Sequence, residues 1–203
     1  MADNGVAVYR YDKRNLAHSK EMLLNPKYTV KEEYLLGLKL VLEELKKMTE
    51  IDSNQIIIMG HSQAGYLIPY FEKNLNNVHG YIALGAPFDP MPEALLNKDD
   101  PALHANYVAS IKSNGPAQSN NTRLPQKMLL IYGGRDIQVP AQEMEKWRLA
   151  GSTDPQRNWT FSVFPKLNHL AIAGEGVASV ANYNKAGNVP YEVILKMASF
   201  ILY

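Results

Sequence analysis

One short stretch constrains the fold of this chain more than any other. Three consecutive isoleucines, residues 56–58, form an uninterrupted apolar run, which is typical of a strand covered on both faces in a parallel sheet. A turn of small residues follows at once, with Gly60 before Ser62 and Gly65 after it, so the backbone can turn sharply without side-chain clashes. The pattern predicts a strand, a tight turn that presents the Ser62 hydroxyl, and a helix whose N-terminal N–H groups face the same point.

Two later segments place an acid and a base in matching positions. Residues 128–132 form a second buried-strand pattern, and the turn after them carries Asp136. Residues 159–164 form a third, and the next loop carries His169. Catalytic groups of open α/β sheets lie just beyond the carboxyl ends of the strands. The order Ser62, Asp136, His169 therefore predicts that three groups from three strand ends meet at one edge of a sheet.

Strand and helix patterns alternate along the rest of the chain, which indicates an α/β fold with a mainly parallel sheet. Residues 6–11 and 78–86 read as further strands. A capping box at residues 29–32 opens an amphipathic helix expected over 30–48, and a C-terminal helix is expected after Pro190. Pro69 should kink or shorten the helix that follows Ser62. Residues 1–203 are expected to form a single domain.

Composition excludes several classes of protein. The formal net charge is +1 with no block of like charges, so neither a nucleic-acid site nor a polybasic membrane patch is expected. The chain has no cysteine, no apolar run long enough for a membrane span and no signal-peptide pattern. Cytoplasmic placement is expected for the chain as given, and a secreted or periplasmic one stays open if the natural N-terminus lies upstream. No residue cluster has metal-ligand spacing and no phosphate loop is present, so no metal or cofactor is expected.

The three polar groups suit nucleophilic catalysis. A serine hydroxyl is a poor nucleophile at neutral pH, so His169 would take the proton of Ser62 as the hydroxyl attacks a carbonyl. Asp136 would accept a hydrogen bond from the other imidazole nitrogen and fix the tautomer. The backbone N–H of Gln63, at the start of the helix, would stabilise the oxyanion. No second oxyanion donor is identifiable in the sequence.

Other candidates for these roles have weaker positions. His61 directly precedes Ser62 and should point away from its hydroxyl, so packing or a hydrogen bond near the turn is expected there. Aspartates are common in turns and helix caps, which makes Asp136 the better acid. The alternatives that remain are solvated histidines (His18, His79, His104), acids in turns or caps (Asp89, Asp99, Asp100) and a salt bridge or loop anchor after the first strand (Asp12, Arg14).

Three motifs together resemble the α/β-hydrolase superfamily, whose triad follows the order Ser, Asp or Glu, His. They are residues 60–65 (GHSQAG), 133–140 (GGRDIQVP) and 167–170 (LNHL). Residues 4–14 also resemble the fourth strand and following loop of its esterase-like members. The resemblance is to the serine esterase and lipase side, in the dienelactone hydrolase or prolyl oligopeptidase-like branch. It implies a three-layer α/β/α sandwich, hydrolysis of a small-molecule carboxylic ester through an acyl-enzyme, and a small lid at about 87–125.

The chain departs from the pattern of that superfamily at its start. The nucleophile strand there is the fifth of eight, and the loop after the third strand supplies one oxyanion N–H. Here only residues 6–11 precede the nucleophile strand, so the first three strands are expected to be lacking. Either the chain is part of a longer protein, or residues 6–11 move over to pair with residues 56–59. An open sheet edge would favour self-association. Two alternative functions remain. One is a serine peptidase or amidase, and the other is a weak or inactive hydrolase that lacks the oxyanion loop.

Overall fold

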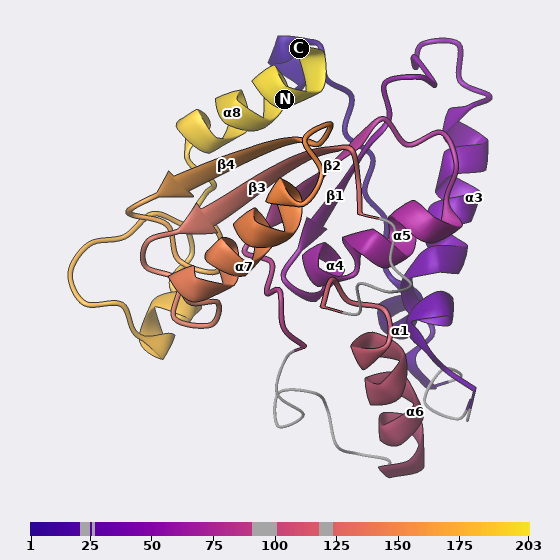
Figure 1. Ribbon diagram of the computed structural model, residues 1–203, viewed down its shortest axis with the longest axis horizontal. Coiled ribbons are helices and arrows are strands. Elements are labelled where there is room, and N and C mark those ends of the chain that lie inside the picture. Colours follow the sequence, from indigo (N-terminus) through magenta and orange to yellow (C-terminus); the bar gives the residue numbers. More distant parts are fainter. Residues whose placement is uncertain (21–24, 26, 91–100, 118–123) are drawn as a thin grey trace.

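A sheet of four parallel strands forms the centre of the molecule (Figure 1). The structure is a computed structural model that describes residues 1–20, 25, 27–90, 101–117 and 124–203. The strands lie in sequence order across the sheet: β1 (Ile57–His61), β2 (Gly80–Leu84), β3 (Lys127–Gly133) and β4 (Asn158–Phe164). The four strands expected near these positions are confirmed, and all their carboxyl ends meet at one edge of the sheet.

Both faces of the sheet are buried, which explains the uninterrupted apolar strand sequences. Along β3, Met128, Leu130 and Tyr132 pack into one core cluster, whereas Leu129 and Ile131 pack into the other. The first cluster includes residues of the helices between β1 and β4, and the second includes residues of the C-terminal helix. The fold is thus the expected three-layer α/β/α sandwich.

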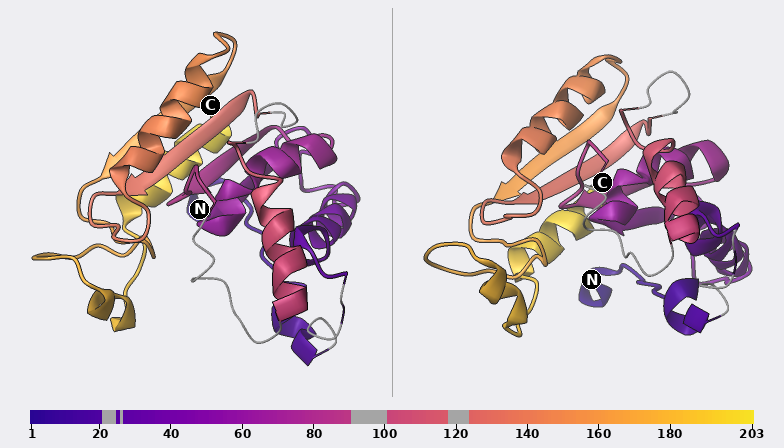
Figure 2. Two further views of the ribbon diagram at one scale, coloured as in Figure 1. Left: turned by 60° about the horizontal axis from the view of Figure 1, so that its bottom comes forward. Right: turned by 90° about the horizontal axis from the view of Figure 1, so that it is seen from below.

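The helices divide unequally between the two faces. Figure 2 shows α7 and α8 on opposite sides of the sheet. The helices whose residues join the first core cluster are η2 (Lys31–Leu35), α3 (Leu36–Leu45), α4 (Gln63–Tyr66), α5 (Ile68–Asn74), α6 (Pro101–Lys112) and α7 (Ala141–Ser152). On the other face lies α8 (Tyr191–Leu202), joined by Met1. The remaining short helices in the described part of the chain are η1 (Ala2–Asn4), α1 (Arg14–Ala17) and η4 (Val180–Asn184).

Two local expectations about helices hold with small changes. The helix expected over 30–48 runs from Lys31 to Leu45, as one π-helical turn followed by α3. The Glu32 carboxylate accepts the Thr29 backbone N–H at 2.9 Å, which is one half of the expected capping box. The other half is not formed, and the Thr29 hydroxyl instead donates to the same carboxylate at 2.6 Å. The helix after Ser62 breaks at Leu67, and Pro69 lies in the first turn of α5, where its missing N–H costs nothing.

The strand expected at residues 6–11 is wrong. The segment is irregular and makes no backbone ladder, and among the described residues nothing pairs with the outer edge of β1. Two contacts hold the segment against η2 and α3 instead: the Lys13 ammonium donates to Glu33 at 2.8 Å, and the Tyr11 ring lies against Gly37. The alternative in which residues 6–11 pair with β1 is therefore wrong as well. Self-association through this edge, where the Met59 side chain is 47% exposed, stays a prediction.

The interval 87–125 contains α6, which packs on the first core cluster. The acids Asp99 and Asp100 lie outside the described residues. The lid and the single domain stay predictions. Within the part of the chain that the structure describes, no helix is long and apolar enough to cross a membrane.

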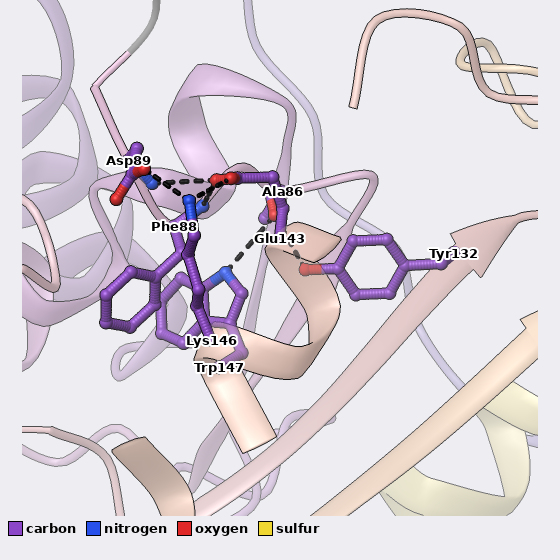
Figure 3. A network of polar contacts seen from close by, with 7 residues as sticks. All are labelled: Ala86, Phe88, Asp89, Tyr132, Glu143, Lys146 and Trp147. Atoms are coloured by element: carbon purple, nitrogen blue, oxygen red, sulfur yellow. Dashed lines mark hydrogen bonds and ion pairs between the residues drawn. The ribbon is translucent and has the colours of Figure 1, made fainter. Parts of the chain in front are cut away.

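A buried carboxylate fixes the segment that leaves β2 (Figure 3). Glu143, in the first turn of α7, accepts the backbone N–H groups of Phe88 and Asp89, both at 2.8 Å. Lys146, one turn later, forms ion pairs with Glu143 and Asp89. Just before them, the Ala86 carbonyl accepts hydrogen bonds from the Tyr132 hydroxyl and the Trp147 indole (Figure 3). The start of the predicted lid is thus anchored to α7 and β3.

Replacing Glu143 tests this anchor. Glu143→Ala should lower the free energy of unfolding by about 1–3 kcal/mol, because two N–H groups lose their acceptor in a half-buried site. The measurement is urea unfolding followed by circular dichroism. Glu145→Ala is the matched control, because Glu145 lies in the same helix but is exposed and, among the described residues, pairs with Arg148 alone. It should change stability by less than about 0.5 kcal/mol. Equal effects of the two substitutions would contradict the anchor.

Candidate active site

Ser62 stands at a strained turn between β1 and α4. Its backbone has φ 53° and ψ −118°, a region that a residue with a side chain rarely adopts. A Cβ at Gly60 would lie 2.6 Å from the Ala64 carbonyl carbon, and one at Gly65 would lie 2.6 Å from the Ala86 methyl, so both positions need glycine. The Ser62 N–H donates to the Leu84 carbonyl at 2.9 Å. This bond ties the turn to the end of β2.

Asp136 is held rigidly in the loop after β3. One carboxylate oxygen accepts the backbone N–H groups of Gln138 and Val139 at 2.8 and 2.9 Å. The other accepts the Nδ1–H of His169 at 2.8 Å. The Asp136 side chain is only 1% exposed. The two hydrogen bonds to the first oxygen therefore orient the carboxylate so that its second oxygen faces the His169 ring.

His169 lies in a tight loop after β4 that is folded around a side chain. The Asn168 amide oxygen accepts the N–H groups of Leu170 and Ile172 at 2.9 and 3.1 Å. The His169 side chain is 5% exposed. Because Nδ1 carries the proton given to Asp136, Nε2 is the unprotonated nitrogen of the neutral ring. The ring is thus oriented as a base whose accepting atom is Nε2.

The loops after β3 and β4 meet through their backbones. The Arg135 N–H donates to the Leu167 carbonyl at 2.9 Å. A Cβ at Gly133 would lie 2.3 Å from the Leu167 oxygen, so a side chain there would push the loops apart. The Asp136–His169 bond depends on this close approach.

His61 is tied to the same loop from the side of the serine. Its Nε2 lies 2.7 Å from the His169 carbonyl oxygen, and the two rings are 4.8 Å apart between centroids. A carbonyl only accepts, so His61 carries its proton on Nε2. Burial lowers the pKa of His61 below its ordinary value, in spite of this hydrogen bond. His61 makes a hydrogen bond beside the turn, as the sequence indicated.

The structure joins two of the three expected groups by a direct hydrogen bond. This bond is between Asp136 and His169, whereas Ser62 is linked to them only indirectly, through its neighbour His61 and through β2. In the part of the chain described, Ser62 Oγ makes no hydrogen bond to the His169 ring. Asp89 pairs with Lys146 rather than with a histidine, and His79 lies beside Lys127 at the amino ends of the strands.

Two features of the site were missed from the sequence. Gly85, with φ 53°, passes so close that a Cβ there would lie 3.3 Å from both Asp136 Oδ2 and His169 Nδ1. A glycine directly after a buried strand was the available signal. Tyr34 and Tyr107 donate to the side-chain oxygen of Gln63 at 2.8 and 3.1 Å. Tyr34 sits in the apolar stripe of its helix, so the sequence indicated only a core role. Among the described residues there is no cluster suited to a metal ion.

Comparison with known proteins gives one family and a set of related folds. The sequence profile of the "Prolyl oligopeptidase family" matches residues 30–187. The chain is 28% identical over 237 residues to "Esterase EstD" of Thermotoga maritima, with all of this chain covered but 55% of that protein. The chain thus spans about half the length of the curated relative that it matches.

Solved structures share the fold at low identity. An acylaminoacyl peptidase of Pyrococcus horikoshii matches with a TM-score of 0.52 and 17% identity, over 73% of this chain and 25% of that one. The esterase domain of a Rhodothermus marinus protein matches with a TM-score of 0.50 and 16% identity, over 66% and 59% of the two chains. These likenesses concern the fold alone.

The partly buried His61 should make the fold less stable in acid. In the unfolded chain its imidazole takes up a proton near pH 6.5, whereas burial holds the pKa lower in the folded state. The unfolded state then binds more protons, so the free energy of unfolding should fall as the pH drops below about 6.5. Urea unfolding at pH 7.5, 6.5 and 5.5 measures this slope. His61→Asn should make it shallower, whereas His18→Asn, at an exposed histidine, should not; identical slopes in all three proteins would refute the assignment.

Proposed function

This chain belongs to the prolyl oligopeptidase family, and we propose that it is a serine hydrolase of that family which cleaves carboxylic esters through an acyl-enzyme. The observation that carries the proposal is the 2.8 Å hydrogen bond between the buried Asp136 and His169, beside the strained turn at Ser62. A carboxylate that orients an imidazole next to an exposed hydroxyl is the arrangement that activates a serine. The named esterase relative supports an ester as the substrate.

Acylation would use each group as its geometry allows. Ser62 Oγ attacks the ester carbonyl while His169 Nε2 takes its proton, and Asp136 stabilises the imidazolium through Nδ1–H. The Gln63 N–H, at the first position of α4, has no acceptor within its own helix, and it would donate to the oxyanion. When the tetrahedral intermediate collapses, the carbon–oxygen bond to the alcohol breaks, and His169 returns the proton to the leaving oxygen.

Deacylation would repeat these steps with water. His169 Nε2 takes a proton from a water molecule as its oxygen attacks the acyl carbonyl, and the proton then goes to Ser62 Oγ as the acid leaves. No added cofactor is needed for this balance of protons and bonds. The burial of the Asp136 and His169 side chains suits the step, since hydrogen bonds to developing charge are stronger where water is excluded.

Two alternatives remain as proposals. A serine peptidase or amidase is favoured by the fold shared with an acylaminoacyl peptidase, because the same triad cleaves both bonds. Rates on matched ester and aminoacyl-amide substrates separate these two. A weak or inactive hydrolase is favoured by the oxyanion site, since no second donor has been identified in the described residues. Turnover of either substrate at a normal rate would remove that alternative.

The nucleophile can be tested by covalent labelling. A fluorophosphonate probe should label the protein, because it reacts with an activated serine hydroxyl. Ser62→Ala should abolish both labelling and ester hydrolysis while the far-UV circular dichroism spectrum stays unchanged. Ser113→Ala, at an exposed serine after α6, is the matched control and should be labelled as the unchanged chain is. Equal labelling of the Ser62→Ala protein would contradict the assignment.

Substitutions of the proposed base and of its acid should lower the activity by different factors. His169→Ala should lower kcat by roughly 10³-fold or more, and Asp136→Asn somewhat less, by analogy with other triads. The measurement is kcat with a short p-nitrophenyl ester. A normal rate for His169→Ala would mean that another histidine is the base, with His61 the next to test.

A further inference from the structure

A partly buried chain of polar groups leads from an ion pair to the residue that follows Ser62. The Lys13 ammonium donates to Glu33 at 2.8 Å and to the Tyr34 hydroxyl at 3.2 Å, and it also lies over the Tyr34 ring. The Glu33 side chain is 4% exposed and accepts the Tyr28 hydroxyl at 2.7 Å. The Tyr34 hydroxyl is 2.8 Å from the side-chain oxygen of Gln63, and the Tyr107 hydroxyl is 3.1 Å from it.

The direction of the hydrogen bonds in this chain is fixed by its first member. An ammonium only donates, so the Tyr34 oxygen accepts from Lys13 and must give its own proton to another group. Gln63 is that group at 2.8 Å, and the atom that accepts a proton there is the amide oxygen. Burial, reinforced by the charge of Glu33, raises the pKa of Tyr34, which keeps the phenol proton in place at neutral pH. A reversed amide would put its N–H₂ group against a hydroxyl that already accepts from Lys13.

The other end of the amide is consequently left as a donor. With Oε1 fixed toward Tyr34 and Tyr107, Nε2 faces the opposite way, and none of the described residues offers it an acceptor within hydrogen-bonding distance. Gln63 is half-buried, and Nε2 is not among the buried polar atoms that lack a partner. An oriented donor beside the nucleophile is therefore available to a bound molecule.

The position of Gln63 decides which part of an ester it can reach. The alcohol must lie by His169, which returns a proton to it. Gln63 is anchored instead on α6 and on the helix that contains Tyr34, and both lie away from the loops that follow β3 and β4 (Figures 1 and 2). The acyl group stays attached to Ser62, the neighbour of Gln63, throughout the acyl-enzyme step. The side-chain amide thus lies on the acyl side of the site.

We propose that the Gln63 side-chain amide selects esters whose acyl group carries an oxygen acceptor close to the scissile carbonyl, with Tyr34 as the residue that positions it. This inference rests on the proposed ester hydrolysis and adds to it a substrate class. Gln63 then has two separate roles: its backbone N–H serves the oxyanion, and its side chain binds the acyl group. Lys13 and Glu33 act through the tyrosines that contact Gln63.

The test compares p-nitrophenyl methoxyacetate with p-nitrophenyl butyrate, which have equal chain length but differ by an ether oxygen in place of a methylene. The readout is kcat/KM for the methoxyacetate ester divided by kcat/KM for the butyrate ester. The intrinsic reactivity of each ester cancels when this ratio in a variant is compared with the ratio in the unchanged chain. Gln63→Leu should lower the ratio roughly 3- to 10-fold, the effect of one neutral hydrogen bond. Gln63→Glu should lower it at least as far, since it keeps an acceptor for Tyr34 but replaces the donor with oxygen.

Tyr34→Phe tests the positioning. It leaves Gln63 in place but removes the proton that fixes its amide, so the ratio should fall toward that of Gln63→Leu. Tyr70→Phe removes a hydroxyl from neighbouring α5 that is not bonded to Gln63, and it should leave the ratio unchanged. A ratio that stays the same in Gln63→Leu, in a protein that still hydrolyses butyrate, overturns the inference while the proposed function stands.

A second readout needs no turnover. In ¹H–¹⁵N spectra the side-chain amide signal of Gln63, assigned by its loss in Gln63→Leu, should shift on titration with methoxyacetate and shift less with butyrate. Absence of ester hydrolysis and of fluorophosphonate labelling would defeat the proposed function, and the selection of esters would fall with it. A Gln63 signal that fails to respond to methoxyacetate, in a protein that still hydrolyses butyrate esters, would defeat the inference alone.

Discussion

The close approach of two loop backbones, after β3 and after β4, is the constraint on which the rest of the site depends. Parallel pairing carries these strands to the carboxyl edge together, with Gly133 opposite Phe164. The lack of a side chain at Gly133 then lets the Arg135 N–H reach the Leu167 carbonyl. Only at this separation can a short aspartate side chain bridge to the His169 ring. The geometry of the acid and base is therefore a property of the sheet register as much as of the two residues.

The serine is fastened to this pair by backbone contacts and by the preceding residue. The Ser62 N–H binds the Leu84 carbonyl, and the His61 ring holds the His169 carbonyl. These bonds leave the Ser62 hydroxyl uncommitted within the described residues, and they also oppose any movement of the His169 loop away from the turn. The strain of a positive φ at Ser62, on the order of 1–3 kcal/mol, is carried by the same surroundings.

How much of the fold and the site the sequence predicts depends on where the deciding contacts lie. Uninterrupted apolar runs predicted all four strands because both sheet faces are buried, and polar residues just after strands predicted the positions of Asp136 and His169. Residues 6–11 carry the same local pattern, but their place is decided by Lys13 with Glu33 and by Tyr11 with Gly37, which are far apart in the chain. The hydroxyl of Tyr34 was equally hidden, since an aromatic residue in an apolar helical stripe reads as core.

The positions of β1 and β4 at the two outer edges of the described sheet divide the proposed catalytic machinery into parts of unequal local stability. Among the described residues β1, which leads to Ser62, and β4, which leads to His169, each have a partner strand on one side only, whereas β3, which leads to Asp136, is bonded on both sides. Local opening in proteins begins where hydrogen bonding is one-sided, at free energies well below that of global unfolding. Thermal fluctuations should therefore move the nucleophile and the base away from Asp136 before the core melts. Heat inactivation would then occur before the loss of secondary structure. It would involve a smaller cooperative unit than global unfolding does.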